Sequence, residues 1–299
     1  MKKYLILFAA IMAVLLLVSP VAAVAGSGTA GDPYIVTTPA ELQAISSDLD
    51  AYYALGNDID LSGVTWTPIG STSTPFIGSF DGRNYTISNL VINTPSTSYV
   101  GLFAVFGPGA VGKYTKLNNI NLIASSNTGG FVGAVIMSSG TTVDAYLTGI
   151  ELDDSSIYGS GNQVGGIVGY VYNYANLTLT DCFAFDSKIE SGGSSCGGIA
   201  GCAAYSNSNA DFANCYVINC ALSAVTERCG GIAGTAAYTN SNADFANCYV
   251  TDCTIYAPTY SGGVFGRHYL PSTYTVDDCT IERNTIISTG YSAGIGVVT

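Results

Sequence analysis

The feature that most constrains the fold of this chain is a duplication of 33 residues. Residues 196–228 and 229–261 form two consecutive blocks in which 23 of the 33 positions carry the same amino acid. Weaker copies of the glycine-rich opening begin near residues 100, 129, 165, 262 and 293, so the repeat length varies from 29 to 36 residues. A period in this range is typical of solenoids and propellers, in which each unit buries its apolar face only against its neighbours. The chain is therefore predicted to be a repeat protein.

The first 25 residues have the pattern of a secretion signal. Lys2 and Lys3 precede an apolar run over residues 4–18, and the small residues at 23–25 fit a cleavage site before Gly26. The apolar run is short for a membrane-spanning helix, and no second long apolar stretch follows. The mature chain is therefore predicted to be secreted or displayed at the cell surface, without insertion into a membrane.

The charge argues against nucleic acid as a partner, and the composition favours a fold built from strands. Removal of Lys2 and Lys3 with the leader changes the formal net charge from −12 to −14. Binding to nucleic acid phosphates needs clustered Lys and Arg, so no nucleic acid partner is expected. Only 10% of the residues are charged, whereas 36 are Gly and 21 are Tyr. This composition favours strands joined by tight turns over helices.

One segment is predicted to be helical. Residues 38–41, with the sequence Thr-Pro-Ala-Glu, form a capping box with Pro at the first helical position. Leu42, Ile45 and Leu49 follow at helical spacing on one face. Because the open end of a solenoid exposes apolar core and unpaired strands, a short helix here is expected to cap the N-terminal end. Residues 26–99 would form this cap and the first turns, and residues 100–299 the regular repeats.

Each repeat is predicted to contain three short strands. A Gly-Gly-apolar strand is followed by a polar loop, an alternating strand and a corner, after which a third strand begins with Cys. Earlier strands are expected over residues 59–61, 76–80 and 86–91. Three strands in about 32 residues describe one turn of a parallel β-helix, whereas a propeller blade needs four antiparallel strands in about 40 residues. With turns about 4.8 Å apart, the repeats would form an all-β rod roughly 30 to 35 Å long.

Several segments, taken in order, resemble secreted prokaryotic proteins that carry GLUG motifs. The resemblance covers residue 31 to the end of the chain and departs from the family pattern in its nine cysteines. It implies a right-handed parallel β-helix in an adhesin-like setting, with no general catalytic residues. It rests on GDPYIV at 31–36, NDIDLSG at 57–63, WTPIG at 66–70, GSFDG at 78–82, YTISNL at 85–90, VGLF at 100–103 and VGGIVG at 164–169.

The cysteines recur at equivalent positions of successive repeats. Stacked positions on adjacent turns lie about 5 Å apart, within disulfide range, so Cys196 with Cys229 and Cys220 with Cys253 are candidate disulfides in an exported protein. The alternative is that all the thiols are reduced and buried. The chain has no Cys-x-x-Cys pair and its only histidine is His268, so neither a metal site nor a cofactor is predicted.

Two pairs of adjacent carboxylates deserve comparison with a glycosidase site. Residues 153–154 and 277–278 are both Asp-Asp, and paired carboxylates catalyse glycoside hydrolysis. However, Asp278 aligns with Asp181, Asn214 and Asn247, where Asn and Asp suit a corner of the repeat. Residues 57–60 suggest a calcium loop only faintly, because the spacing of an EF-hand is missing. Both groups are therefore interpreted as turn residues.

Tyrosines supply the remaining candidate site. Tyr205 and Tyr238 are one repeat apart, as are Tyr216 and Tyr249, so columns of rings could form a platform for sugars or another protein. The alternative is that a repeated sequence simply repeats its aromatic residues on the outside of the coil. Asn84 and Asn176 begin Asn-x-Thr sequons and are candidate glycosylation sites.

Together these features predict a non-catalytic extracellular β-helix that serves adhesion, ligand binding or envelope structure. The expected partners are surface glycans, other cell-surface proteins or further copies of the chain. Two alternatives stay open. The first is a secreted β-helix polysaccharide hydrolase or lyase, which a groove with several acidic side chains would favour. The second is a self-assembling subunit of a surface layer or sheath.

Overall fold

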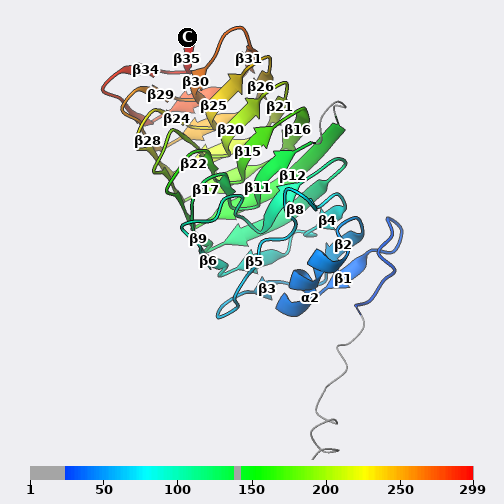
Figure 1. Ribbon diagram of the computed structural model, residues 1–299. Coiled ribbons are helices and arrows are strands. Elements are labelled where there is room, and N and C mark those ends of the chain that lie inside the picture. The colour runs from blue at the N-terminus through cyan, green and yellow to red at the C-terminus, as the bar shows by residue number, and fades with distance from the viewer. Residues whose placement is uncertain (1–23, 138–142, 299) are drawn as a thin grey trace, which may run out of the picture.

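The computed structural model describes residues 24–137 and 143–298, and these residues form a parallel β-solenoid (Figure 1). Strands of successive turns stack in register into four sheets. Sheet 1 follows the order β1 (Tyr34–Val36), β2 (Tyr52–Leu55), β4 (Ser79–Asp81), β8 (Val111–Asn118), β12 (Val143–Asp153), β16 (Ala175–Thr180), β21 (Asn209–Ala213), β26 (Asn242–Ala246) and β31 (Thr273–Asp277). Its side branches are β3 (Ile59–Asp60), β5 (Thr86–Ser88), β17 (Phe183–Phe185), β22 (Tyr216–Ile218), β27 (Tyr249–Thr251) and β32 (Thr280–Glu282).

The other three sheets run alongside it. Sheet 2 contains β10 (Thr128–Gly129), β14 (Val164–Gly165), β19 (Ser195–Gly197), β24 (Arg228–Gly230), β29 (Tyr260–Gly262) and β34 (Tyr291–Ala293). Sheet 3 contains β7 (Phe103–Phe106), β11 (Val132–Ile136), β15 (Val168–Tyr172), β20 (Ala200–Tyr205), β25 (Ala233–Tyr238), β30 (Phe265–His268) and β35 (Val297–Val298). Sheet 4 contains β6 (Val91–Asn93), β9 (Asn121–Ala124), β13 (Ser156–Gly159), β18 (Lys188–Ser191), β23 (Ala221–Ala224), β28 (Thr254–Tyr256) and β33 (Thr285–Ile287).

The solenoid confirms the predicted fold class, but each regular turn holds five strands and not three. The turn that begins at β20 continues through β21, β22, β23 and β24. The strand that begins after Cys215 ends at a second corner, Asn219, which the sequence pattern did not reveal. A further short strand of sheet 2 then leads into the Gly-Gly segment. The three-strand prediction was wrong because it treated this second corner as part of a continuous strand.

Asn and Asp form both corners through their backbone conformation. The predicted corner residues Asp181, Asn214, Asn247 and Asp278 have φ of 52°, 53°, 52° and 47°. The unpredicted second corner has the same left-handed backbone, with φ of 53° at Asn219. Asn and Asp tolerate this region better than other residues with a side chain, so the corner column is confirmed. The Asn214 side-chain amide also donates to the Asp181 carboxylate of the preceding turn, at 3.1 Å.

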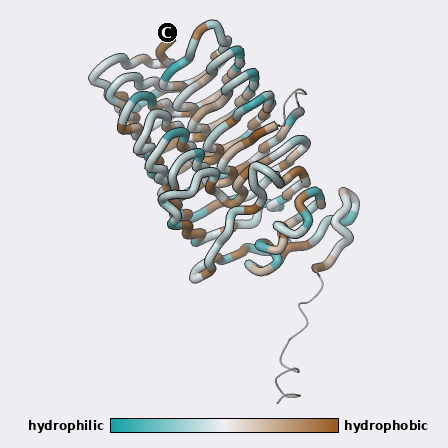
Figure 2. The backbone as a smooth tube through the Cα atoms, viewed as in Figure 1, coloured by the Kyte–Doolittle hydropathy of each residue, from teal (hydrophilic) through white to brown (hydrophobic). Residues whose placement is uncertain are grey.

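Apolar side chains fill the inside of the coil along its whole length. Within sheet 1, the fully buried rings of Phe212 and Phe245 stack on adjacent turns with centroids 5.0 Å apart. Figure 2 shows hydrophobic segments recurring along the strands of successive turns. The paired glycines allow backbone segments of adjacent turns to approach closely. A Cβ atom on Gly198 would lie 2.3 Å from the carbonyl oxygen of Gly231.

The predicted capping helix is present as α2 (Pro39–Ala44), followed by the 3-10 helix η1 (Ile45–Ser47). The Thr38 hydroxyl accepts a hydrogen bond from the Glu41 N–H at 3.2 Å, and the Glu41 carboxylate accepts one from the Thr38 N–H at 3.0 Å. Leu42 and Ile45 are fully buried. The helix lies at the end of the solenoid opposite the C-terminus (Figure 1). The capping-box prediction is confirmed, while the domain boundary at residue 99 stays a prediction.

The predicted leader lies outside the described residues except for Val24 and Ala25. Ala25 forms an antiparallel bridge with Ile35, whose N–H donates to the Ala25 carbonyl at 2.7 Å. Within residues 24–137 and 143–298, no helix has the length and hydropathy needed to cross a membrane.

Candidate binding surfaces

Five half-buried tyrosines form a continuous row on sheet 3 and the loop after it. Strand pairing aligns Tyr172 with Tyr205 and Tyr205 with Tyr238 on successive turns. The centroids of the Tyr172 and Tyr205 rings are 5.7 Å apart, and those of Tyr205 and Tyr238 are 4.7 Å apart. We call this row the tyrosine stripe, and it consists of Tyr170, Tyr172, Tyr205, Tyr238 and Tyr269.

Stacking determines what the tyrosine stripe can offer to a ligand. The Tyr205 and Tyr238 planes differ by only 4°, so each ring covers a face of the other. At this pair the stripe presents ring edges and phenolic hydroxyls, and the Tyr170 and Tyr172 rings are also parallel within 12°. The other ring contacts of the stripe are tilted or edge-on, at 48° to 72°. Burial, followed by the neighbouring Tyr238, raises the pKa of Tyr205, so its phenol stays protonated at neutral pH and can donate a hydrogen bond. Such a row suits edge-on contact with a protein or glycan better than flat stacking of sugar rings.

Two arginines lie at the C-terminal end of the stripe. The Arg267 guanidinium carbon is 4.0 Å from the Tyr269 ring centroid and 4.3 Å from that of Tyr260, and Arg228 lies 5.3 Å from Tyr269. These distances are within cation–π range. Arg228 is also paired with the Glu227 carboxylate, and its guanidinium donates to the Thr235 hydroxyl at 3.1 Å. The stripe thus ends in a polar cluster, in which the Glu227 carboxylate offsets part of the positive charge of the two arginines.

The other predicted tyrosines form a separate ladder. Tyr216 and Tyr249 stack with centroids 5.2 Å apart, and Phe183 extends the ladder by another 5.2 Å contact with Tyr216. These residues lie on β17, β22 and β27, which are side strands of sheet 1. The four predicted platform residues are therefore divided between two strand stacks, and only Tyr205 and Tyr238 belong to the tyrosine stripe.

All nine cysteines fall within the described ranges, where they are free thiols. Strand pairing places Cys196 directly opposite Cys229, as predicted for stacked positions. Burial raises the pKa of the Cys229 thiol well above its ordinary value, with Cys196 adding to the effect. Cys202, which has no cysteine neighbour in its column, has a pKa raised by burial to about 12. Bonding between Cys196 and Cys229 stays a prediction.

The Cys220 and Cys253 column has a hydrogen-bonding role that serine fills in earlier turns. The Cys253 sulfur accepts from the Cys220 N–H at 3.4 Å, and its thiol donates to the Thr251 carbonyl at 3.2 Å. In the earlier turns, the Ser187 hydroxyl accepts from the Ser155 N–H at 3.1 Å in the same way. This equivalence favours a structural thiol at the corner, although a Cys220–Cys253 disulfide also stays a prediction.

The carboxylates considered for catalysis or calcium serve the turns. Asp154 has φ of 44° at a corner, and Asp153 accepts a hydrogen bond from Asn118 at 3.2 Å. Asp277 pairs with Ala246, several turns away from Asp153, so the structure does not bring the two Asp-Asp pairs together. Asp60 accepts from the Ser62 N–H at 2.9 Å. The described part of the chain contains no cluster of three or more His, Cys, Asp or Glu suited to a metal ion.

The two sequons differ in their surroundings. Asn84 is exposed and has φ of 62° in a turn. Asn176 is half-buried, and its side-chain amide donates to Asp144 at 3.0 Å while its oxygen accepts from Asn209 at 2.8 Å. Glycosylation of either residue stays a prediction, and the geometry suits Asn84 better.

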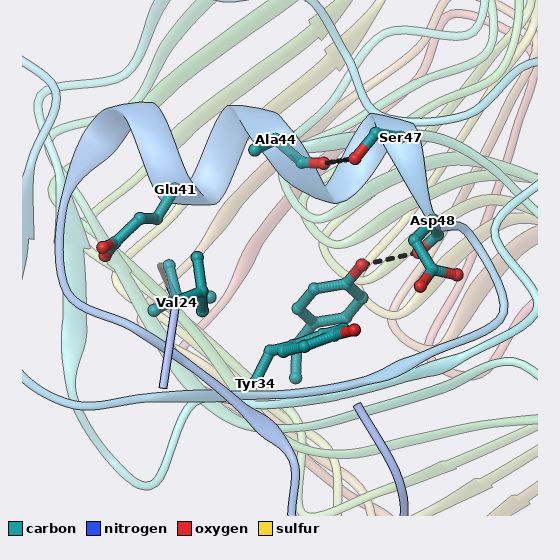
Figure 3. A pocket seen from close by; sticks show the side chains of 8 residues that line it. Val24, Tyr34, Glu41, Ala44, Ser47 and Asp48 are labelled. Atoms are coloured by element: carbon teal, nitrogen blue, oxygen red, sulfur yellow. Dashed lines mark hydrogen bonds between the residues drawn. The ribbon is translucent and has the colours of Figure 1, made fainter. Parts of the chain in front are cut away.

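A small pocket lies beneath the capping helix (Figure 3). The Tyr53 hydroxyl donates to the Asp48 carbonyl at 2.6 Å, and the rings of Tyr34 and Tyr53 are 5.6 Å apart. Burial acts to raise the Glu41 pKa, but hydrogen bonds at the start of the helix outweigh it and lower the pKa. The polar groups here thus stabilise the cap. The pocket is lined by Val24, Tyr34, Val36, Glu41, Ala44, Ser47, Asp48 and Tyr53.

Sequence reasoning missed a polar groove on the outer face of sheet 1. The signal was present in the duplicated Asn-Ala-Asp at residues 209–211 and 242–244, where every second residue faces outward. The groove was missed because the duplication aligns only residues 209–211 with 242–244. The register of Asp144 and Tyr146 is hidden by the variable length of the repeats before residue 196. We call it the polar groove, and it is lined by Asp144, Tyr146, Asn176, Thr178, Asn209, Asp211, Asn242 and Asp244.

Two known proteins resemble parts of this chain in sequence. No known family model matches the chain. Halomucin of Haloquadratum walsbyi is 33% identical over 156 residues, which are 48% of this chain and 2% of that protein. The "Putative Gly-rich membrane protein" of Evansella cellulosilytica is 30% identical over 125 residues, or 37% of this chain and 14% of that protein. The chain thus spans only a small part of both relatives.

A solved structure shows the same fold. The "putative immunoglobulin A1 protease" of Bacteroides ovatus superimposes with a TM-score of 0.53 over 92% of this chain and 86% of that chain. The sequence identity is 21%, so this likeness concerns the fold alone.

Proposed function

We propose that this protein is a non-catalytic extracellular β-solenoid of the adhesin-like GLUG type, which contacts other surface molecules through the tyrosine stripe. The observation that carries the proposal is the unbroken row of tyrosines on adjacent turns, ending at Arg228 and Arg267. Tyr and Arg are among the residues enriched at binding hot spots. A rigid rod also holds such a row in one geometry, which reduces the entropy lost on binding.

The names of the two relatives support the surface location in this proposal. One of them is named as a membrane protein, and the other as halomucin. A surface location is expected to give peptides of this chain when intact native cells are shaved with protease and the released peptides are identified by mass spectrometry. Intact protein found only in the culture medium would contradict cell-surface display.

The stripe itself is tested by a pair of matched double variants. Tyr205→Ala with Tyr238→Ala removes the centre of the tyrosine stripe, whereas Tyr216→Ala with Tyr249→Ala makes the same change on the separate ladder. Labelled wild-type protein is expected to bind intact native cells, and the stripe variant to bind at least about tenfold more weakly. The ladder variant should bind like the wild type. Equal binding by both variants would overturn the proposal, and melting curves would show whether both are folded.

The polysaccharide hydrolase or lyase is the second candidate. The observation that favours it is the polar groove, which gathers Asp144, Asp211 and Asp244 on one face. Release of new sugar ends from a polysaccharide by the wild-type protein, lost in an Asp211→Asn variant, would support this candidate against the non-catalytic one.

A further inference from the structure

The polar groove is a repeating arrangement that runs along the rod axis. Strand pairing aligns Asn176 with Asn209 and Asn209 with Asn242, and it aligns Thr178 with Asp211 and Asp211 with Asp244. Each of these three turns, about 4.8 Å apart, therefore presents one amide and one hydroxyl or carboxylate in the same two columns. A groove with this periodicity suits a linear polymer lying across the strands.

Most of the side chains in the groove are held in place by one another. Asn176 donates to Asp144 at 3.0 Å, and Asn209 donates to Asn176 at 2.8 Å. At the other end, the Thr275 hydroxyl donates to Asp244 at 2.6 Å. Among the described residues, no hydrogen bond or ion pair reaches the exposed Asp211 carboxylate in the middle of the groove. The groove is therefore ordered before a ligand arrives, and it keeps one free acceptor at its centre.

The groove has an exposed aromatic ring at one end. Tyr146 is 42% exposed, and its hydroxyl donates to Asp144 at 3.0 Å. In its column it lies between Val111 and Thr178, and no aromatic side chain of the described residues stacks on it. This distinguishes Tyr146 from the tyrosine stripe, where every ring contacts another aromatic ring. The exposed part of this ring can contact the apolar face of a sugar.

The charge of the groove restricts the ligand further. Three carboxylates line it and no lysine or arginine does, so it repels uronic acid and sulfated polymers. A peptide would bind a sheet mainly through strand addition at an edge, whereas the backbone hydrogen bonds of β16, β21 and β26 are already used within sheet 1. Hydroxyl and amino groups of a sugar need only side-chain partners, which amides and carboxylates provide.

We infer that the polar groove binds a linear polysaccharide with neutral or amino-bearing sugars, whose chain runs along the rod axis and stacks one sugar on Tyr146. Asn176, Asn209 and Asn242 exchange hydrogen bonds with sugar hydroxyls, and Asp211 accepts from a hydroxyl or an ammonium group. The site lies on sheet 1 and the tyrosine stripe on sheet 3, so this inference does not depend on the function proposed for the stripe.

The test is calorimetric titration of the full-length folded protein with three oligosaccharides of equal length. They are a chitosan oligomer, a cello-oligosaccharide and an oligogalacturonate, which carry amino, neutral and anionic sugars. The chitosan oligomer is expected to bind most tightly, the neutral one more weakly, and the oligogalacturonate not measurably. Failure of all three to bind, or equal binding of the anionic oligomer, would overturn the inference.

Matched variants locate the binding. Tyr146→Ala with Asp211→Asn changes the groove, whereas Tyr158→Ala with Asp181→Asn changes a ring of similar exposure on sheet 4 and a corner carboxylate. The groove variant is expected to bind the chitosan oligomer at least about tenfold more weakly, because a stacking contact and a charged hydrogen bond are lost. The control variant should stay within about twofold of the wild type. Equal losses in both variants would overturn the assignment to the groove.

Shortening of the oligomer during titration would support the glycan class and contradict the non-catalytic function.

Discussion

The rings of Tyr205 and Tyr238 lie parallel, with centroids 4.7 Å apart and planes 4° apart. Because the turns of the solenoid have nearly the same spacing, identical side chains in one column stack on each other. A repeated tyrosine in the sequence of a β-solenoid therefore indicates a ladder, and not an open platform of ring faces. An aromatic residue with unlike neighbours in its column, such as Tyr146, is not covered by another aromatic ring and stays 42% exposed.

The glycine pairs are expected to matter more for stability than the tyrosine ladder. A Cβ on Gly198 would lie 2.3 Å from the Gly231 carbonyl oxygen, so Gly198→Val must push two turns apart. Overpacking of this kind costs about 1–3 kcal/mol or more. Pushing the turns apart also weakens the buried hydrogen bond from the Gly198 N–H to the Gly231 carbonyl, which adds about 1–3 kcal/mol. Tyr238→Ala removes two ring contacts of about 0.5–1.5 kcal/mol each. Urea unfolding should therefore show the larger loss for Gly198→Val.

Gly294 provides a matched control for this comparison. It occupies the same place in the last repeat, but a Cβ there would meet no atom within 4 Å. Gly294→Val should therefore leave the free energy of unfolding nearly unchanged. If Gly198→Val and Tyr238→Ala had equal midpoints, close approach of the backbone would not explain the glycines.

The features that could be predicted from sequence are those with local chemical signals. The capping box at Thr38 and Glu41 and the Asn and Asp corners follow from preferences of single residues, and the duplication reveals the repeat. The second corner carries the same signal at Asn219 and Asp252, but it was missed because the residues after Cys215 were interpreted as one continuous strand. The polar groove depends on which residues become neighbours through register, so Asp144 and Asn176 could not be joined from their separation of 32 residues in the chain.

Serine is expected to replace cysteine at the second corner with little loss. The Cys253 sulfur accepts from the buried Cys220 N–H, as the Ser187 hydroxyl does from Ser155. Under reducing conditions, Cys253→Ser should change the free energy of unfolding by less than about 1 kcal/mol. Cys253→Ala leaves the N–H unsatisfied and should cost about 1–3 kcal/mol.

The same variants also test the predicted disulfide. If Cys220 and Cys253 were bonded, Cys253→Ser would cost about 2–5 kcal/mol without reductant and much less with it. Counting of free thiols in the denatured, unreduced wild-type protein would give an independent answer. A reductant-dependent loss would contradict the structural role of the free thiol.

The ionised form of the Asp211 carboxylate is expected to destabilise the folded protein. Although Asp211 is exposed in the groove, partial desolvation of its carboxylate, followed by repulsion from Asp244 and Asp144, raises its pKa above the ordinary value of 3.8. The folded state therefore binds the proton more readily than the unfolded state, and stability falls as the pH rises through the raised pKa. Asp211→Asn should raise the melting temperature at pH 7, and the difference should vanish below about pH 3.8, where both states are protonated.

Asp60 supplies a control of opposite sign. Hydrogen bonds from Asn89 and Ser62 lower the pKa of its carboxyl, so its ionised form favours the folded state. Asp60→Asn should lower the melting temperature at neutral pH, and this loss should disappear as the pH falls through the lowered pKa. If both variants changed the melting temperature in the same direction at neutral pH, the causes assigned to both pKa shifts would be contradicted.

The N-terminal cap is expected to protect the first strands from opening. The Thr38 hydroxyl accepts from the Glu41 N–H, and α2 holds Leu42 in a fully buried position at this end of the solenoid. Thr38→Ala should cost about 1 kcal/mol, the usual loss for an N-cap. Because the helix covers the end of the coil, that loss should speed hydrogen exchange in β1 and β2 more than in β20 and β25. Ser46→Ala, at an exposed position in η1, is the control, and peptide-level exchange followed by mass spectrometry is the measurement. Uniform acceleration along the whole chain would mean that α2 stabilises the solenoid globally, and unchanged exchange in β1 and β2 would mean that it does not act as a lid.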